Sequence, residues 1–431
     1  MEIKEEMTAE TAMKTPQTST ETRIDHVAAP TRVPLLDMER ELGPLMADLV
    51  EATARVLASG RYVFGPECGE LESSIAQYCG AEFGVACASG SDALLLALMA
   101  LDIKPGDEVI VPSFTFFATA SAVTRLGATP VFVDIDPATF NIDPHLVEVS
   151  LTARTKAIIP VHLFGQCADM DSITQLARQH GIFVIEDAAQ AIGARTGDRS
   201  AGSLGDLGCF SFYPTKNLGG CGDGGMITTS NEALASRLRL LRGHGMHPRY
   251  FHQAVGINSR LDTIQAAILQ VKLPHLPAWT RERQSNAARY DQMFRVAGLD
   301  QVLTLPMARD GYHHVWNQYT VRVADQQRDA LRLYLSAAEI GTEIYYPVPL
   351  HRQECFSYLG YNDGDLPDTE RAAGEVMSLP IFPGLTEKEQ QTVVDRIARF
   401  FFGAEATTSS SPARPKYLTG KGAARENTAT S

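Results

Sequence analysis

Short apolar runs alternate with amphipathic segments along the middle of the chain, and this alternation limits the possible folds most strongly. The apolar runs lie at 107–114, 129–136, 156–165 and 181–190, whereas 91–101 and 170–181 combine helix-forming residues with an apolar stripe. Nearly continuous apolar strands separated by helices are typical of a parallel sheet that helices cover on both faces. The sequence therefore predicts an α/β fold in which ligands bind at the carboxyl ends of the strands.

The length of the chain, 431 residues, predicts two domains, because one hydrophobic core rarely grows so large. We expect a large domain at 31–274. After Leu273 the pattern changes to helices around an alternating strand at 317–325, which indicates a smaller α+β domain at 275–402. The polar segments 1–30 and 403–431 are predicted to be disordered tails.

Composition excludes several classes of partner and location. The formal net charge is −13 and no basic block interrupts it, which argues against binding to nucleic acid or to an anionic membrane. The seven cysteines are scattered without a CxxC pair, as in a reduced protein without a zinc site. The polar N-terminus is not a signal peptide, and no apolar run reaches the roughly 18 residues that span a membrane. We expect a cytoplasmic protein.

One lysine, Lys216, stands in the unusual stretch FSFYPTKNLGGCGDGG at 210–225. It can be a surface lysine on a loop, but its apolar surroundings favour a lowered pKa and an amine able to act as a nucleophile. Gly220, Gly222 and Gly225 match GxGxxG. The strand-like MITTS that follows them indicates a glycine-rich turn rather than a dinucleotide site, which needs a helix there.

Three further features fit a planar, phosphorylated cofactor. SGSDAL at 89–94 begins a helix, where free backbone amides suit an anion, although a serine N-cap explains the same pattern. Asp187 ends an apolar strand, as the counter-ion of a buried cation or as a helix cap or salt-bridge partner. Phe114, Phe116 and Phe117 follow another strand, as core residues or as a ring that stacks on a ligand. With an amine nucleophile, these features together indicate pyridoxal 5'-phosphate.

Five motifs in order carry a resemblance to a known family: SGSDALLLAL, PSFTFFATA, EDAAQAIGA, FSFYPTKNLGGCGDGG and GINSRLDTIQAAIL. From about residue 33 to 402 the chain resembles the DegT/DnrJ/EryC1/StrS sugar aminotransferases. The resemblance implies a fold-type I pyridoxal-phosphate enzyme. Its large domain would hold a mixed, mostly parallel seven-stranded sheet covered by helices, beside a smaller C-terminal α+β domain.

The resemblance also implies roles for individual residues. Lys216 would bind the cofactor covalently and act as general acid and base, Asp187 would pair with the pyridine nitrogen, and Gln190 would contact the phenolic oxygen. Phe116 would stack on the ring, and Gly90, Ser91 and Ser211 would hold the phosphate. Asn258 would reach the phosphate of a neighbouring subunit, so that the active unit would be a homodimer with shared sites.

The implied reaction moves an amino group from glutamate to a nucleotide-linked keto-sugar. The implied substrate contacts are Gly60, Tyr62, Thr215, Arg260, Tyr345 and Tyr346. Arg260 can clamp a uronate or a diphosphate, or form an ion pair with Asp262. Members that act on 4-keto sugars more often carry His where Tyr213 stands, which favours the C3 position. His351 is either a substrate contact or a packed structural residue.

Three alternatives remain open from the sequence. The family includes dehydratases, but these carry His at the position of Lys216. A 4-keto-sugar aminotransferase is the second alternative. A non-catalytic pyridoxal-phosphate-binding regulator is the third, and Lys216, Asp187 and Gln190 together favour catalysis over it.

Overall fold

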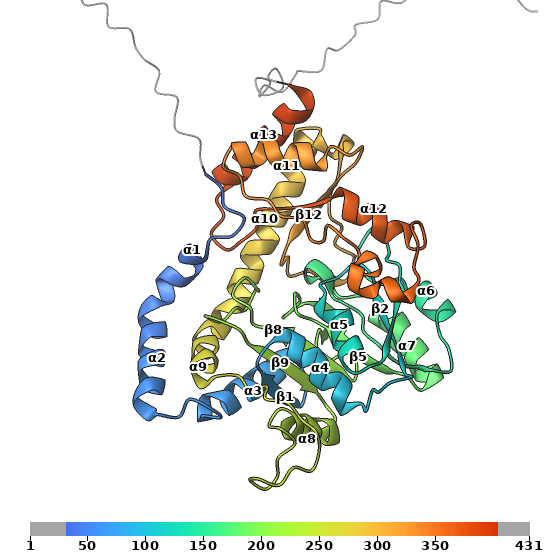
Figure 1. Ribbon diagram of the computed structural model, residues 1–431. Coiled ribbons are helices and arrows are strands. Elements are labelled where there is room, and N and C mark those ends of the chain that lie inside the picture. The colour runs from blue at the N-terminus through green and yellow to red at the C-terminus, as the bar shows by residue number, and fades with distance from the viewer. Residues whose placement is uncertain (1–31, 404–431) are drawn as a thin grey trace, which may run out of the picture.

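A seven-stranded sheet forms the centre of the large domain in the computed structural model, which describes residues 32–403 (Figure 1). Strand β9 runs antiparallel to both of its neighbours, β1 and β8, and the other pairs are parallel. The predicted mixed, mostly parallel seven-stranded sheet is thus confirmed. In sheet order the strands are β1 (Phe83–Cys87), β9 (Gly225–Thr229), β8 (Leu207–Ser211), β5 (Phe183–Asp187), β4 (Thr155–Ile158), β2 (Glu108–Pro112) and β3 (Thr129–Val133).

Helices cover both faces of this sheet. Successive side chains of each strand point to opposite faces, so each strand contributes apolar side chains to both layers of helices. In β5, Val184 packs into one apolar cluster and Ile185 into another. The first cluster includes residues of α3 (Pro66–Cys79), α7 (Met170–His180) and α9 (Thr263–Lys272). The second includes residues of α4 (Gly90–Ala100), α5 (Ala118–Arg125) and α8 (Glu232–Leu241). This double burial explains the continuously apolar strands of the sequence.

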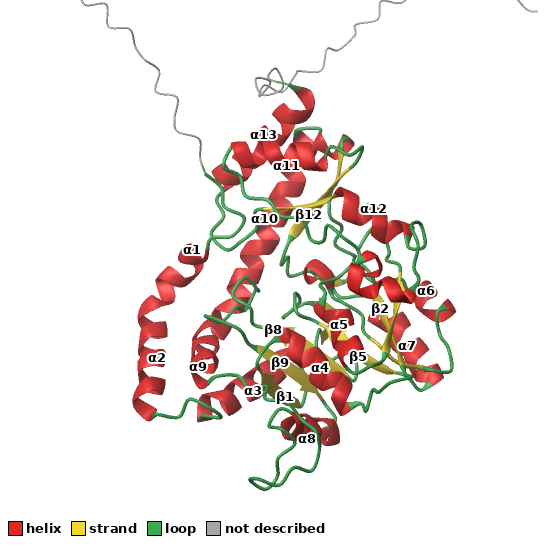
Figure 2. Cartoon of the chain, viewed as in Figure 1, coloured by secondary structure: helices red, strands yellow, loops and turns green. Residues whose placement is uncertain are grey.

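A second core belongs to the smaller, C-terminal part of the chain. Around it lie a three-stranded sheet and the long helix α10, which Figure 2 shows running from this part toward the large sheet. The elements are α10 (Leu276–Val296), β10 (Leu303–Thr304), β12 (Tyr319–Val323), α11 (Arg328–Ala337), α12 (Pro367–Glu375), β13 (Val376–Leu379) and α13 (Glu387–Phe402). The predicted smaller α+β domain is therefore present. The boundary at 274/275 falls in the turn Leu273–His275 and stays a prediction.

The remaining elements are short or peripheral. Two N-terminal helices, α1 (Met38–Leu42) and α2 (Met46–Ser59), run beside α9 and α10 in Figure 1. Helix α6 is Pro144–Val149, and a small sheet joins β6 (Arg195–Thr196), β7 (Arg199–Ser200) and β11 (Tyr312–His313). The two predicted tails lie outside the described residues, except for Gly403. Within 32–403, no helix is long and apolar enough to cross a membrane.

An ion pair ties α1 to the smaller domain. The Arg40 guanidinium donates two hydrogen bonds to the Glu389 carboxylate, of 2.9 and 2.7 Å, and these contacts lower the pKa of Glu389 to about 2. Glu389 also closes a capping box with Thr386 at the start of α13. The ionised carboxylate therefore stabilises the folded protein.

We predict that Glu389→Gln lowers the free energy of unfolding by roughly 2 kcal/mol at pH 7, an amount reduced by the partial exposure of Arg40. Gln preserves the capping box, so the loss reports the charge. The native pKa is depressed, so the difference should be full above about pH 5 and disappear as pH falls to about 2. Urea unfolding of both proteins across this pH range measures the difference in unfolding free energy. A difference that persists at pH 2 would contradict the depressed pKa of Glu389.

Candidate active site

The predicted catalytic residues come together at the carboxyl ends of strands β5 and β8. Asp187 is the last residue of β5 and pairs with Cys209 of the neighbouring strand β8. Strand β8 ends two residues later at Ser211, and the loop that follows carries Lys216. Parallel pairing of two strands thus places a carboxylate beside the loop that holds the lysine.

A tight turn holds Lys216. Its backbone N–H donates to the Tyr213 carbonyl at 2.9 Å, and the Gly220 N–H donates to the Phe212 carbonyl at 2.8 Å. A Cβ at Gly219 would collide with the Pro214 carbonyl, which explains the glycine there. The Lys216 side chain is half-buried, and desolvation lowers its pKa to about 8 although Asp187 opposes the shift. The predicted lowering of the lysine pKa is present, and it leaves a larger neutral fraction of the amine near physiological pH than an ordinary lysine has.

Asp187 is a buried carboxylate with few partners. Its Oδ2 accepts a hydrogen bond of 2.7 Å from the Thr119 hydroxyl, and its Oδ1 accepts a longer one of 3.3 Å from the Ala189 N–H. Burial raises the pKa of Asp187, and these hydrogen bonds and the nearby Lys216 only partly offset it. The site therefore favours a cation beside this carboxylate, such as a protonated pyridine nitrogen.

Thr119 is a contact of Asp187 that sequence reasoning missed. It lies on α5 and within the motif PSFTFFATA, but no spacing rule connects it to a residue 68 positions away.

Glu186, the neighbour of Asp187, faces the opposite side of the sheet as strand alternation predicts. It accepts hydrogen bonds from the backbone N–H groups of Gly202, Leu204 and Gly205, and it pairs with His162. These contacts give it a structural role.

Of the three phenylalanines after β2, Phe116 is the most exposed. Phe114 is fully buried in the core, and Phe117 packs against Phe356. Phe116 is 57% exposed and lies 6.2 Å, centroid to centroid, from the Tyr346 ring. The structure therefore separates the two interpretations that the sequence left open for these residues.

Gln190 and Tyr346 form a polar pair beside this ring. The Gln190 side chain donates from Nε2 to the Tyr346 hydroxyl at 3.2 Å and accepts at Oε1 from the Phe164 N–H at 2.7 Å. Burial raises the pKa of Tyr346, so its hydroxyl stays protonated. This arrangement fixes an amide and a phenol next to Phe116, although 156 residues separate Gln190 from Tyr346.

The start of α4 meets Ser211 in a narrow cradle. Ser89 caps the helix by accepting a hydrogen bond from the Asp92 N–H, and Gly90 is the first helical residue. A Cβ added at Gly90 would lie 2.7 Å from the Ser211 Cβ, and one at Gly225 would collide with the Ser89 backbone. Glycines thus keep open a space lined by Gly90, half-buried Ser91 and Ser211, at a helix end that suits a phosphate.

A second group of predicted residues lies together on the surface, near the start of α9. Asn258 is exposed, and its Oδ1 accepts a hydrogen bond of 2.8 Å from Arg260, whose guanidinium lies 5.8 Å from the Phe64 ring centroid. Tyr62, 49% exposed, follows Gly60 at the end of α2, and its carbonyl accepts from the Thr263 N–H. The alternative of an Arg260–Asp262 ion pair is absent among the ion pairs of residues 32–403.

The other predicted substrate contacts lie near Lys216 and Asp187. Thr215 is exposed and precedes the lysine, and Tyr345 and Tyr346 place their ring centroids 5.8 Å apart. Burial raises the pKa of Tyr345, and Glu343 and Tyr213 add to the shift, which places Tyr213 near this pair.

His351 has a structural environment. It is buried, its Nδ1 lies 2.7 Å from the Ser113 hydroxyl, and its Nε2 lies 3.2 Å from Glu370. The structure favours the packed structural histidine over a substrate contact.

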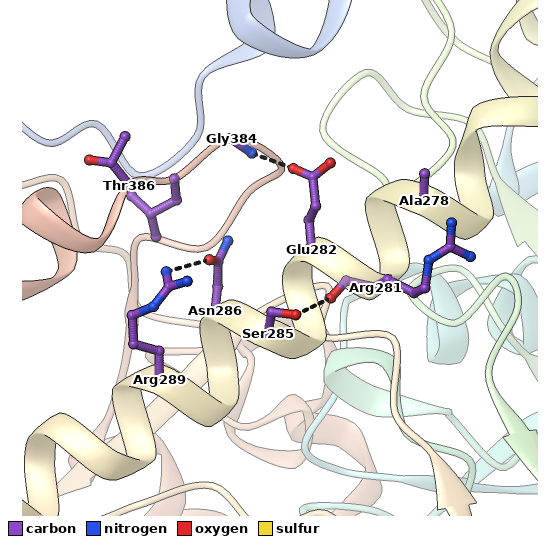
Figure 3. Close-up of a pocket in the computed structure, with 9 residues that line it drawn as sticks. Ala278, Arg281, Glu282, Ser285, Asn286, Arg289, Gly384 and Thr386 are labelled. Carbon is purple, nitrogen blue, oxygen red and sulfur yellow. Dashed lines mark hydrogen bonds between the residues drawn. The ribbon is translucent and has the colours of Figure 1, made fainter.

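A surface pocket of about 400 Å³ contains none of the predicted site residues (Figure 3). It lies between α10 and the turn at 384–386, and its polar groups already bind one another: Glu282 accepts from the Gly384 N–H, and Arg289 donates to Asn286. The convergence of Lys216, Asp187 and the glycine cradle is a stronger indication of an active site than cavity size.

A protein-family model, that of the DegT/DnrJ/EryC1/StrS aminotransferase family, matches residues 45–398. The chain belongs to this family. It is 50% identical to a pleiotropic regulatory protein of Geobacillus stearothermophilus over 86% of this chain and 98% of the relative. It is 46% identical to a UDP-N-acetyl-3-dehydro-alpha-D-glucosamine 3-aminotransferase of Acidithiobacillus ferrooxidans, over 86% of this chain and 99% of that protein.

The fold is also that of solved family members. The crystal structure of DesV from S. venezuelae, in complex with a ketimine intermediate, superposes with a TM-score of 0.82 at 45% identity, covering 86% of this chain and 98% of that one. The predicted fold class and family are confirmed. The chain is a pyridoxal-phosphate-dependent aminotransferase, and solved relatives carry the cofactor in its PLP and PMP forms.

The residues of this chain fit that cofactor. The cradle at Gly90 and Ser211 suits its phosphate, the sparsely partnered Asp187 suits its ring nitrogen, and the Lys216 amine has the lowered pKa that covalent attachment requires. The roles of the individual residues remain predictions.

We predict that Lys216 of the cofactor-free protein reacts with an amine-directed acylating reagent with a midpoint near pH 8, because its lowered pKa leaves the amine neutral above that value. The exposed Lys156 serves as the control. Mass spectrometry of labelled peptides measures both. Asp187→Asn should move the Lys216 midpoint lower, since the carboxylate favours the ammonium form; an upward shift would contradict this geometry.

Proposed function

We propose that this protein transfers an amino group from glutamate to the C3 keto carbon of a nucleotide-linked sugar, for the synthesis of an amino sugar. The observation that carries this proposal is the placement of Lys216, on the loop after β8, close enough to Asp187 at the end of β5 for the carboxylate to influence its pKa, in a chain of this family. The C3 position is supported by the 3-aminotransferase relative and by the exposed Tyr213.

The protein side chains would divide the chemistry among them. The bound cofactor supplies an electron sink that stabilises negative charge on the carbon being aminated. The Lys216 Nζ would carry a proton to and from the reacting carbon, a task suited to an amine with a pKa of about 8. The Asp187 carboxylate would hold a proton on the ring nitrogen. Gln190 and Tyr346, joined by their hydrogen bond, would orient the ring, with Phe116 stacked on it.

The substrate would bind among exposed aromatic and polar groups. Tyr213 and Thr215 are exposed on the loop that carries Lys216, and half-buried Tyr345 lies near Tyr213. The Arg260 guanidinium has no carboxylate partner among the described residues, so it is available for a diphosphate or a uronate.

We further propose a homodimer in which Asn258 and Arg260 complete the site of the partner subunit. Within one chain, these residues form a surface group with Tyr62 and Phe64. Exposed apolar side chains accompany them on the segment between α8 and α9, including Tyr250, Phe251 and Val255. Exposed apolar surface of this kind is typical of subunit contacts.

The runner-up is a cofactor-binding regulator. One observation favours it: the relative that is 50% identical is named a regulatory protein. The retained Lys216 and Asp187 support catalysis instead. The free state of all seven cysteines supports the proposed cytoplasmic location.

The function is tested by the visible spectrum of the cofactor-loaded protein and by product analysis. Stoichiometric glutamate should bleach the band of the lysine-bound cofactor, and adding a UDP-linked 3-keto-N-acetylglucosamine should restore it with formation of the 3-amino product. Lys216→Ala should lack the band and Lys216→His should give no amino sugar. A regulator would leave the sugar unchanged, and preference for a 4-keto sugar would reject the C3 assignment.

Shared sites predict complementation between two inactive variants. Lys216→Ala and Asn258→Asp should each be inactive alone, the second because its carboxylate repels the phosphate. When both are co-expressed, random pairing should restore about a quarter of the wild-type sites, since each heterodimer has one intact site. The turnover of the separated heterodimer measures this. A heterodimer as inactive as its parents would place Asn258 in the site of its own chain.

A further inference from the structure

A fully buried lysine, Lys272, ends α9 behind the loop that carries Lys216. Its Nζ donates a hydrogen bond of 2.6 Å to the Gly219 carbonyl and lies 3.3 Å from a Glu41 carboxylate oxygen. The Trp279 ring covers it, with the centroid 5.7 Å from Nζ. Burying an ammonium is costly unless it is paired, and here the partners come from three separate segments.

The hydrogen bond from Lys272 to the Gly219 carbonyl holds the loop that carries Lys216. Gly219 is three residues beyond Lys216, and the turn between them has no room for a side chain at Gly219. Gln265 lies seven residues before Lys272 on the same helix, which is about two helical turns. Its Oε1 accepts from the Cys221 N–H at 2.8 Å. Helix α9 thus holds this loop at two points, the Gly219 carbonyl and the Cys221 amide.

The contact with Glu41 connects the same lysine to the smaller domain. Glu41 is buried on α1, and its neighbour Arg40 binds both Glu389 and the Gly384 carbonyl. Gly384 belongs to the turn that Glu282 holds from α10, as Figure 3 shows. One five-residue helix therefore contacts the smaller domain through Arg40 and the buried lysine through Glu41.

We propose that Lys272, neutralised by Glu41, is a positioning residue that fixes the loop of Lys216 relative to Asp187. This inference rests on the proposed role of Lys216. An ammonium is suited to the task because its several N–H donors bind the Gly219 carbonyl and the Glu41 carboxylate at once. A methionine of similar length fills the space but leaves both oxygens without a donor.

The test compares Lys272→Met with the double variant Glu41→Leu/Lys272→Met, and uses Lys156→Met at an exposed lysine as the matched control. The single variant leaves the Glu41 charge buried and should lower the melting temperature. The double variant removes both charges, and such replacements are often tolerated, so its melting temperature should return toward that of the wild type. In both variants, the Gly219 carbonyl has lost the hydrogen bond that Lys272 donates.

We expect both Lys272 variants to bind pyridoxal 5'-phosphate about tenfold to a hundredfold more weakly, because displacing Lys216 by even a small distance weakens what it does in the site. The pH midpoint of the visible band of the bound cofactor should also shift in both, whereas Lys156→Met should match the wild type. A double variant with wild-type affinity and midpoint would overturn the inference, whatever its stability. Lys216→Ala, measured in parallel, tests the proposed function separately: if it retains the band, Lys216 is not the attachment site.

Discussion

Everything at this site depends on holding the Lys216 amine close to the buried Asp187 carboxylate, where both groups are partly or fully removed from water. Desolvation lowers the pKa of Lys216 and raises that of Asp187, while their mutual attraction opposes both shifts. Neither group would stay in this state on a flexible surface, where water would restore its ordinary pKa. The pairing of β5 with β8, the Thr119 hydroxyl and the tight turn after Phe212 are the means by which the fold keeps them there.

Much of this arrangement was predictable from the sequence because it rests on local patterns. The apolar strand that ends in Asp187, the helix that starts near Gly90 and the glycine-rich turn after Lys216 each follow from residues close in the chain. Strand alternation also correctly separated Glu186 from Asp187. The five motifs then supplied the family, which the family model confirms.

The rest was hidden because it depends on which distant segments meet. The hydrogen bond from Gln190 to Tyr346, the buried pair of Lys272 and Glu41, and the choice of Phe116 over Phe114 all require the tertiary fold. Arg260 shows the same limit: nearby Asp262 suggested an ion pair, but the guanidinium turns to Asn258 and the Phe64 ring instead. Sequence proximity is a poor guide to side-chain direction in an irregular loop.

The glycine cradle divides the site into a part that is difficult to vary and a part that is free to vary. Any side chain at Gly90, Gly219 or Gly225 meets main-chain or serine atoms at once, whereas Tyr213 and Thr215 are exposed on the loop that carries Lys216. With the sugar contacts proposed above, random mutagenesis should find new sugar preferences at these exposed positions while the amino-group chemistry survives. Such a separation gives directed evolution a scaffold in which acceptor choice and cofactor retention are changed independently.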